Sequence, residues 1–286
     1  MQQKYRVSID RITVVGKSSR RMQLSEIKDI LGGGIVLKKG IFSYERQKVN
    51  SDGELMRENG FIVEESHEKN TWRIDFNPNK AGAIEKEKIK QFISTLSYVH
   101  LTRIDVAFDV FNNPLGMKYR LYRKNVSERK IETFKGRSQS IETIYWGARS
   151  SSEQVRLYNK LLEQKKNKID VDENIISWER LELQLRQDKI SDWIKRVDEM
   201  LSELLLPNYE KLDKEDNIAL FALVEGHVNW DYFDKRRVKH LREVAYSGFD
   251  RTLSDELKKE FKDNIEGLKK ELNSYLDEYK IAWRNQ

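Results

Sequence analysis

The sequence predicts an α+β fold, in which a mixed or antiparallel sheet with helices packed on it is followed by a helical C-terminal region. Two observations favour this fold. Strand-like and helix-like segments alternate as far as Asp188, and beyond it apolar residues recur mainly at three- and four-residue steps. We therefore expect two domains, an α+β body over residues 1–188 and a helical region over residues 189–286.

The strands expected in the body alternate apolar and polar residues and end near turn-forming residues. They are Tyr5–Val15, Trp72–Asn77, Thr102–Phe111, Ile141–Trp146, Gln154–Lys160 and Trp178–Arg186. Ile89, Phe92, Ile93 and Leu96 share one face of an expected helix, and glycines 32–34 mark a loop.

Two apolar stripes at helical spacing follow. The first runs from Ile190 to Leu204 and ends before Pro207, and the second runs from Leu253 to Leu276. Because the polar face of the second stripe mixes acidic and basic residues, we expect it to pack in a core or a dimer and not on a membrane.

The composition excludes several classes of protein. Cysteine is absent, which rules out disulfides, cysteine-based zinc sites and thiol catalysis. The 53 basic residues exceed the 47 acidic ones by only six, so a nucleic-acid partner is compatible with the charge but not required by it. No apolar stretch approaches the ~20 residues of a membrane span, and the start lacks a signal-peptide pattern. We expect a cytoplasmic protein with no membrane partner.

Five of the expected strands carry carboxylate, arginine, amide or phenol groups opposite an apolar face. An amphipathic sheet with ion pairs on its wet face would explain any one strand, whereas the recurrence over five favours a shared site. The polar sets are Arg73, Asp75 and Asn77; Arg103, Asp105 and Asp109; Glu142; Arg156, Tyr158 and Lys160; and Arg180, Glu182, Gln184 and Arg186.

This set suits one kind of chemistry. Carboxylates without cysteine or clustered histidine are ligands for Mg²⁺ or Mn²⁺, while arginine and lysine bind phosphate. A tyrosine among them can attack phosphorus as a nucleophile. Since the phenol has a reference pKa of ~10, we expect Arg156 and Lys160 to lower the pKa of Tyr158. The pattern indicates metal-assisted nicking of a phosphodiester by Tyr158.

The same residues carry a family resemblance. The motifs are IDRITVVG near the start, RIDFNPNK (73–80), TRIDVAFDV (102–110), YWGARSSSEQVRLYNK (145–160) and RLELQLRQD (180–188). In this order they resemble the replication initiators of small staphylococcal-type rolling-circle plasmids, in the replication-initiation-factor (Rep_trans) family, which also includes relaxases of some conjugative transposons. A weaker likeness continues through 224–240 to the terminal helix.

The resemblance implies a site-specific, topoisomerase-like endonuclease and ligase that acts at a plasmid double-strand origin. Tyr158 matches the tyrosine of the family motif and would form a 5′-phosphotyrosyl link, leaving a 3′-OH primer for replication. The resemblance also implies a homodimer, Mg²⁺ or Mn²⁺ as cofactor, origin DNA as substrate (duplex and extruded single strand), and a host replicative helicase as partner.

The metal ligands that we expect are Glu142, Glu182 and Asp105, with Asp75 and Asp109 in reserve. Relatives place Glu where Asp75 stands, so this shorter side chain departs from the family pattern. We expect DNA contacts from the basic residues of both regions. They are Arg149, Arg156, Lys160, Arg180 and Arg186 in the body, and Lys235, Arg236, Arg237 and Lys239 in the C-terminal region.

Other signals are set aside. Gly16-Lys17-Ser18 resembles the end of a phosphate-binding loop, but Arg11 stands where the first glycine is required, so we expect no nucleotide cofactor. The four histidines, at positions 67, 100, 227 and 240, are too scattered for a paired metal motif. Tyr145, on the face opposite Glu142, is expected to pack, and the turn from Arg149 to Ser152 is expected to contact phosphate.

Two alternatives stay open. A relaxase or mobilisation protein of a conjugative element would use the same chemistry at a transfer origin. A DNA-binding regulator without catalysis would keep the fold, but the intact RLYNK motif (156–160) and the carboxylates argue against it.

Overall fold

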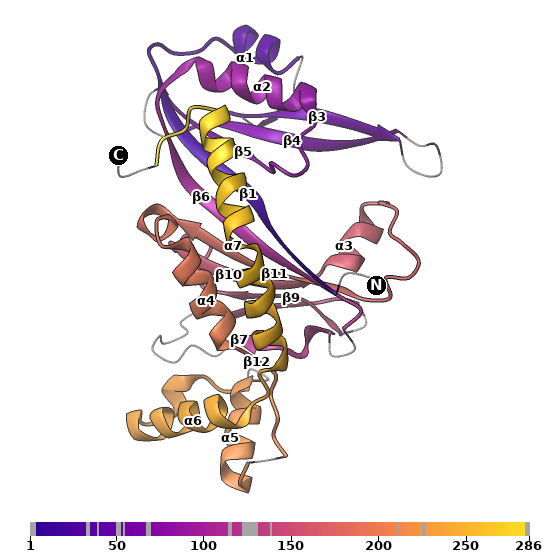
Figure 1. Ribbon diagram of the computed structural model, residues 1–286, viewed down its shortest axis with the longest axis vertical. Helices are drawn as coiled ribbons and strands as arrows, with labels where there is room; N and C mark the ends of the chain where they lie inside the picture. The colour runs from indigo at the N-terminus through magenta and orange to yellow at the C-terminus, as the bar shows by residue number, and fades with distance from the viewer. Residues whose placement is uncertain are drawn as a thin grey trace.

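The computed structural model describes residues 4–32, 35–38, 40–49, 53, 55–66, 70–113, 116–121, 131–137, 139–210, 212–224 and 227–283 (Figure 1). The predicted loop at glycines 33 and 34 and His67 lie outside these residues. The strands are β1 (Tyr5–Ser18), β2 (Ile35–Lys38), β3 (Ile41–Val49), β4 (Leu55–Glu65), β5 (Thr71–Phe76), β6 (Leu96–Phe111), β7 (Arg120–Leu121), β8 (Ile131–Lys135), β9 (Ile141–Trp146), β10 (Glu153–Asn159), β11 (Trp178–Arg186) and β12 (Leu204–Leu205). The helices are α1 (Leu24–Ile30), α2 (Ala83–Ser94), α3 (Lys160–Lys166), α4 (Trp193–Glu203), α5 (Lys214–Val224), α6 (Lys235–Gly248) and α7 (Thr252–Glu278), with short 3₁₀ turns at Gly116–Lys118, Gln187–Ile190 and Trp230–Tyr232.

Within the described residues, ten strands form one sheet in the order β2-β3-β4-β5-β1-β6-β11-β10-β9-β8. Every pairing in this sheet is antiparallel. The predicted α+β class is therefore confirmed, and the sheet is antiparallel. Since β1 and β6 pair along most of their length at the centre, strands far apart in sequence present their side chains on a common face.

The helices α2, α4 and α7 cover one face of the sheet (Figure 1). Phe261 of α7 packs edge-to-face against Phe108 of β6 and Trp193 of α4, with ring centroids 5.9 and 6.0 Å apart. At the other end, Phe92 of α2 meets Trp72 of β5 at 5.5 Å. These contacts belong to one hydrophobic core, so the apolar alternation of the strands is used on this face, and the polar residues are left on the other.

The C-terminal helices divide between two cores. The helices α4 and α7 share the core of the sheet, as the predicted apolar stripes require. A second cluster, built around Leu205, Leu220, Leu241 and Phe249, joins α5 to α6 in a separate lobe at the bottom of Figure 1. The expected division between residues 188 and 189 stays a prediction, since the cores group these helices differently.

Two local predictions were wrong, and one pair of strands was not predicted. Leu96 starts β6 and does not belong to the helix before it, which ends at Ser94. The β3–β4 hairpin, Ile41–Glu65, was not expected because its residues are too charged to look like strands. Lys160 does not end a strand: it is the first residue of α3, which Asn159 caps by accepting a hydrogen bond from the Leu162 N–H.

In the part of the chain that the structure describes, no helix is both long enough and apolar enough to cross a bilayer.

Candidate active site on the uncovered face of the sheet

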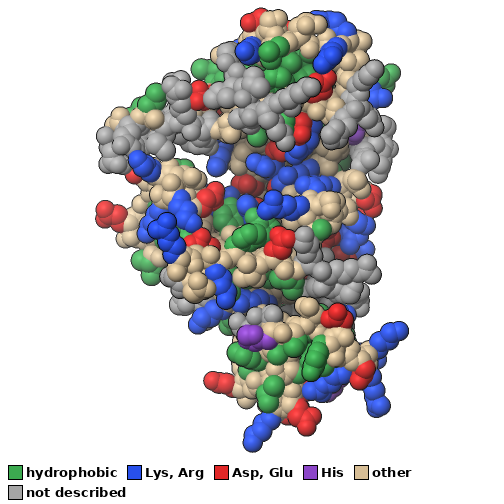
Figure 2. All heavy atoms as spheres, turned by 180° about the vertical axis from the view of Figure 1, so that it is seen from behind, with side chains coloured by type: hydrophobic (Ala, Val, Ile, Leu, Met, Phe, Trp, Pro, Cys, Tyr) green, Lys and Arg blue, Asp and Glu red, His purple; other side chains and the backbone are tan. Residues whose placement is uncertain are grey.

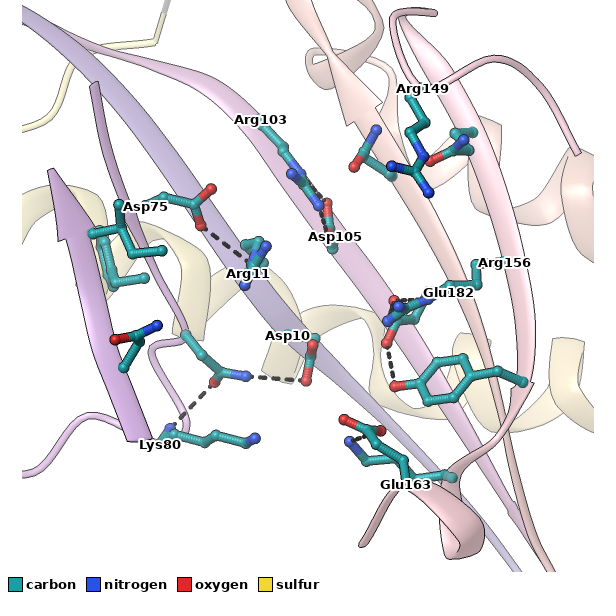
Figure 3. A pocket seen from close by; sticks show the side chains of 18 of the residues that line it. Asp10, Arg11, Asp75, Lys80, Arg103, Asp105, Arg149, Arg156, Glu163 and Glu182 are labelled. Atoms are coloured by element: carbon teal, nitrogen blue, oxygen red, sulfur yellow. Dashed lines mark hydrogen bonds and ion pairs between the residues drawn. The ribbon is translucent and has the colours of Figure 1, made fainter. Parts of the chain in front are cut away.

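The face of the sheet opposite α2, α4 and α7 carries a pocket of about 570 Å³. Figure 2 looks at this side of the molecule and shows Lys and Arg side chains gathered in a band across its middle, mixed with carboxylates. The pocket brings together many of the polar residues that the sequence pattern assigned to one site. Its lining includes Asp75 of β5, Arg103 and Asp105 of β6, Arg156 and Tyr158 of β10, and Glu182 and Arg186 of β11 (Figure 3).

Tyr158 is held at the wall of the pocket by Glu182. Its hydroxyl donates a hydrogen bond of 2.8 Å to Oε1 of Glu182. The second oxygen of Glu182 accepts two hydrogen bonds from the Arg156 guanidinium, at 2.5 and 3.0 Å. That guanidinium also lies 4.1 Å from the centre of the Tyr158 ring. Strand register explains the contact, because Arg156 pairs with Glu182 and Tyr158 is therefore its diagonal neighbour on the same face.

The environment of Tyr158 stabilises the neutral phenol. The residue is 6% exposed, and burial raises its pKa well above the usual value, as does the negative charge of Glu182. Arg156 and Arg180 oppose this shift without cancelling it. Arg156 lowers the pKa of Tyr158, as predicted, but burial and Glu182 outweigh it, so the pKa ends above its usual value. The phenol needs a proton acceptor to react, and Glu182 already accepts its hydrogen bond.

Arg180, close to Tyr158 and Glu182, belongs to a buried ion-pair network. Its guanidinium donates to both oxygens of Asp109, at 2.6 and 2.9 Å, and to Asp10 at 2.7 Å. Asp109 is fully buried and also accepts from Arg6. Arg180 and Asp109 are therefore paired with each other. We had expected Arg180 to contact DNA and Asp109 to be a reserve metal ligand.

Lys160 enters the same pocket from the start of α3. Its side chain is 5% exposed, and its ammonium group donates a hydrogen bond of 2.6 Å to Glu163. The ammonium lies 5.6 Å from the centre of the Tyr158 ring. Lys160 is therefore brought to the predicted site, although by a helix and not by the strand.

The turn between β9 and β10 adds further cations. Gly147 allows the turn, because it has a positive φ of 94° and a Cβ there would lie 2.9 Å from the Glu153 carbonyl oxygen. The Arg186 guanidinium donates to the Arg149 carbonyl at 2.5 Å, which links the turn to β11. Both arginines line the pocket, and neither is ion-paired with a carboxylate in the described part of the chain.

Comparisons with known proteins agree on a single family. Residues 99–219, which hold most of β6 and all of β9, β10 and β11 with Tyr158 and Glu182, match the family model described as Replication initiation factor (Rep_trans). Over these residues the chain is similar to this family. The match spans the motif that contains Tyr158, whereas β1 and β5, with Asp10 and Asp75, lie before it.

Two relatives from Staphylococcus aureus, each called Replication initiation protein, extend the similarity within the family. One is 29% identical over 227 residues, covering 77% of this chain and 68% of the relative. The other is 26% identical over 293 residues, covering 98% and 87%. The solved rolling circle replication initiator protein from Geobacillus stearothermophilus superimposes with a TM-score of 0.40 at 18% identity, covering 73% of this chain and 89% of that chain.

The carboxylates of the pocket fit a divalent cation in a limited way. Among the described residues, no three or more acidic or histidine side chains cluster as a ready-made metal site. Asp105 and Glu182 are close enough for the charge of Glu182 to help raise the pKa of Asp105, which burial raises first, to about 6. A cation between them would relieve this repulsion. Mg²⁺ in phosphoryl-transfer sites is held by one or two carboxylates, which these two residues could supply, together with substrate phosphate and water. Arg103 already donates to both oxygens of Asp105, at 2.7 and 2.5 Å, so a cation would have to compete with it.

The other expected ligands are placed differently. Asp75 lines the pocket but is bound by Arg73 at 2.6 Å and approached by Arg11 at 3.2 Å. Glu142 is not brought to the site. It lies on the Ile144 face of β9, does not line the pocket, and pairs with Lys166 at 2.8 Å. The sequence already indicated this position, because Glu142 is two residues from Ile144 and residues at even spacing in a strand share a face.

Several residues that line the pocket were not predicted from the sequence. Tyr145 was expected to pack, but it lies opposite Arg156 in the β9–β10 pairing and lines the pocket. Asp10, Arg11 and Lys80 line it as well. Asp10 and Arg11 belong to the motif IDRITVVG and Lys80 to RIDFNPNK, so the motifs themselves were the available signal.

The basic cluster of the C-terminal region lies on α6, in the separate lobe. Asp234 caps this helix by accepting hydrogen bonds from the N–H groups of Arg236 and Arg237. Arg237 is tied by its side chain to the buried Asp216 of α5, at 2.7 Å. The other expected DNA contacts, Lys235, Arg236 and Lys239, are exposed on the lobe.

Proposed function

We propose that this protein initiates rolling-circle replication of a plasmid by nicking, and later rejoining, one DNA strand at the double-strand origin. The match to the replication initiation factor family model supports the proposal, as do the names of the relatives. The observation that carries it is the hydrogen bond from Tyr158 to Glu182 inside a pocket lined with arginines. A nucleophile beside its proton acceptor and among phosphate-binding groups is what a transesterase requires.

The proposed reaction uses the chain's own groups as follows. The Tyr158 oxygen attacks the scissile phosphorus while its proton passes to Oε1 of Glu182. The bond from phosphorus to the 3′-oxygen breaks, which leaves a 5′-phosphotyrosyl link and a free 3′-OH. Arg156, which already holds Glu182, keeps that carboxylate oriented and adds positive charge beside the phosphate.

Arg149 and Arg186 would bind the phosphates next to the scissile one. Neither guanidinium is committed to a described carboxylate, unlike that of Arg180. Because Tyr158 is only 6% exposed, we propose that the substrate is an extruded single strand, which can enter the pocket where a rigid duplex cannot.

We propose that Asp105 and Glu182 hold Mg²⁺ or Mn²⁺, together with the DNA. When bound, the ion would polarise the phosphate and offset its developing charge. Asp105 would have to be ionised to bind it.

The exposed cations of α6 would bind the duplex part of the origin. Phosphate contacts by Lys235, Arg236 and Lys239 would position the lobe, while Arg237 keeps α6 seated on α5 through Asp216. We further propose that the protein acts in the cytoplasm as a homodimer and passes the opened DNA to a host replicative helicase. Mass measurement in solution and co-purification with that helicase test these two partners.

A nicking assay tests the proposed function. Supercoiled plasmid carrying the origin is incubated with wild type, Tyr158→Phe or Tyr145→Phe, with Mg²⁺, with Mn²⁺ or with chelator. We expect nicking and a covalent adduct from wild type and from Tyr145→Phe, and neither from Tyr158→Phe. Nicking by Tyr158→Phe would show that Tyr158 is not the nucleophile. Full activity in chelator would show that no divalent ion is required.

A further inference from the structure

Lys160 is a buried cation. A lysine that only binds phosphate would not need to be buried in this way. Its side chain is 5% exposed, while that of its partner Glu163 is 40% exposed. Lysine is seldom buried unless it is paired, because desolvating an ammonium group is unfavourable. Here the ammonium lies 5.6 Å from the centre of the Tyr158 ring and lines the pocket that holds the proposed nucleophile.

The titratable groups that face Lys160 come from four parts of the fold. Tyr158 is on β10, Arg180 on β11, Glu163 on α3 itself, and Lys80 on the turn between β5 and α2. Burial lowers the pKa of Lys160, the positive charges of Arg180 and Lys80 lower it further, and Glu163 opposes them. An ammonium group in such a position gives up a proton more readily than one in water.

The other cations near Tyr158 are not suited to this role. The guanidinium groups of Arg149, Arg156 and Arg186 keep their protons under all ordinary conditions, so they bind phosphate without exchanging protons. A lysine ammonium can do both, since its pKa shifts readily on burial. The proposed reaction also leaves one proton unassigned. Glu182 accepts the proton of Tyr158, but the departing 3′-oxygen must receive one from elsewhere.

We propose that Lys160 is the general acid that protonates the leaving 3′-oxygen during nicking, an inference that rests on the proposed function. As the Tyr158 oxygen bonds to phosphorus and the phosphorus–O3′ bond breaks, a proton moves from the Lys160 ammonium to O3′. The products are a phosphotyrosyl ester, a 3′-OH and a neutral amine. In rejoining, the same amine takes the proton from the attacking 3′-OH, so the two directions use one residue.

Glu163 connects this lysine to solvent. Its carboxylate accepts the hydrogen bond from the ammonium at 2.6 Å and is itself half-exposed. Figure 3 shows Glu163 on the same flank of the pocket as Glu182, facing Asp10 across it. After each transfer the amine can therefore regain a proton through Glu163 without opening the site.

The test uses two single-stranded origin oligonucleotides, one normal and one with sulfur replacing the bridging 3′-oxygen at the nick. Since a thiol has a pKa of ~8.5, the sulfur leaves as a thiolate and needs no proton. Single-turnover cleavage is measured in Mn²⁺ for wild type, Lys160→Met, Lys160→Arg and Lys80→Ala. For the normal oligonucleotide we expect both Lys160 variants to be slower by about 10²–10⁴-fold, the usual contribution of a general acid. For the sulfur oligonucleotide we expect them to come within about tenfold of wild type, allowing for the lost phosphate contact.

The controls separate the possible failures. Lys80→Ala, which removes an exposed cation of the same pocket, should slow both oligonucleotides by the same factor. If the Lys160 variants behave in that way too, Lys160 only binds phosphate and the proposal is wrong. If Lys160→Met fails to fold, Lys160→Arg, which keeps the charge, decides alone. Absence of cleavage by wild type, or cleavage by Tyr158→Phe, would instead overturn the proposed function.

Discussion

The phenol of Tyr158 is hydrogen-bonded to one oxygen of Glu182 while Arg156 holds the other, so that the proposed nucleophile, its proposed proton acceptor and a cation form a single unit on two adjacent strands. Two consequences follow. The phenol is oriented before DNA binds, and it is protected from ionising until its proton can move to Glu182.

Replacing Glu182 should therefore remove catalysis and leave the nucleophile in place. Glu182→Gln keeps the shape but accepts protons poorly and loses the ion pair with Arg156. We expect single-turnover nicking to slow by about 10²–10⁴-fold. Glu142→Gln is the matched control, because Glu142 lies on the other face of the sheet and should change the rate less than about threefold. A large loss of nicking rate in Glu142→Gln would show that Glu142 takes part in the reaction.

The protonation of Tyr158 can be observed directly. Burial and Glu182 raise its pKa well above the ordinary value, so the neutral form persists where exposed tyrosines ionise. In metal-free protein without DNA, ultraviolet titration of wild type and Tyr158→Phe should give the same tyrosinate absorbance up to about pH 11. Extra absorbance in wild type near pH 9 would mean that the site stabilises the phenolate instead.

Asp105 should set the pH dependence of metal binding. Its pKa is raised to about 6, so the carboxyl is protonated below that pH and ionised above it. Protons then compete with the cation as the pH falls, and Mn²⁺ affinity should drop about tenfold between pH 7 and pH 5. Asp105→Asn should bind Mn²⁺ weakly at both pH values, with little dependence on pH. Electron paramagnetic resonance titration measures both, and an unchanged affinity in Asp105→Asn would exclude Asp105 as a ligand.

The α6 cations should act through charge alone. Substituting Lys235, Arg236 and Lys239 together by alanine should weaken binding to origin duplex and to unrelated duplex alike. If each contacts one phosphate, the slope of log affinity against log salt should decrease by ~0.9 per residue. Lys270→Ala, an exposed lysine of α7, is the control and should leave the slope unchanged. Fluorescence anisotropy over a salt series makes the comparison, and an unchanged slope in the triple variant would place the duplex elsewhere.

The sequence predicted the central strands well, because their alternation is imposed by the two faces of a sheet. The polar sets on β6, β10 and β11 were assigned correctly to one face, and Tyr158 was found there. The β3–β4 hairpin was missed because charged residues obscure the alternation in its two strands. The assignment of Glu142 failed for another reason. The strand carries polar residues on both faces, so composition did not show which one met Tyr158.

The sequence also did not show which charged side chains are buried and paired. Arg156 and Arg180 both flank Tyr158, yet Arg180 is neutralised by Asp109 and Asp10, and only the assembled network reveals it. The helix that begins at Lys160 likewise depends on the Asn159 cap, which alternation alone does not signal. The sequence therefore indicated most of the polar groups that line the pocket, while their protonation states and partners required the fold.

The most direct test of the account is the identity of the residue joined to DNA. Wild-type protein is reacted with origin oligonucleotide in Mn²⁺, digested with nuclease and protease, and the nucleotide-bearing peptide is sequenced by mass spectrometry. The account predicts a 5′-phosphate ester on Tyr158 and no adduct with Tyr158→Phe. An adduct on Tyr145 or any other residue, or one that persists in Tyr158→Phe, would contradict it.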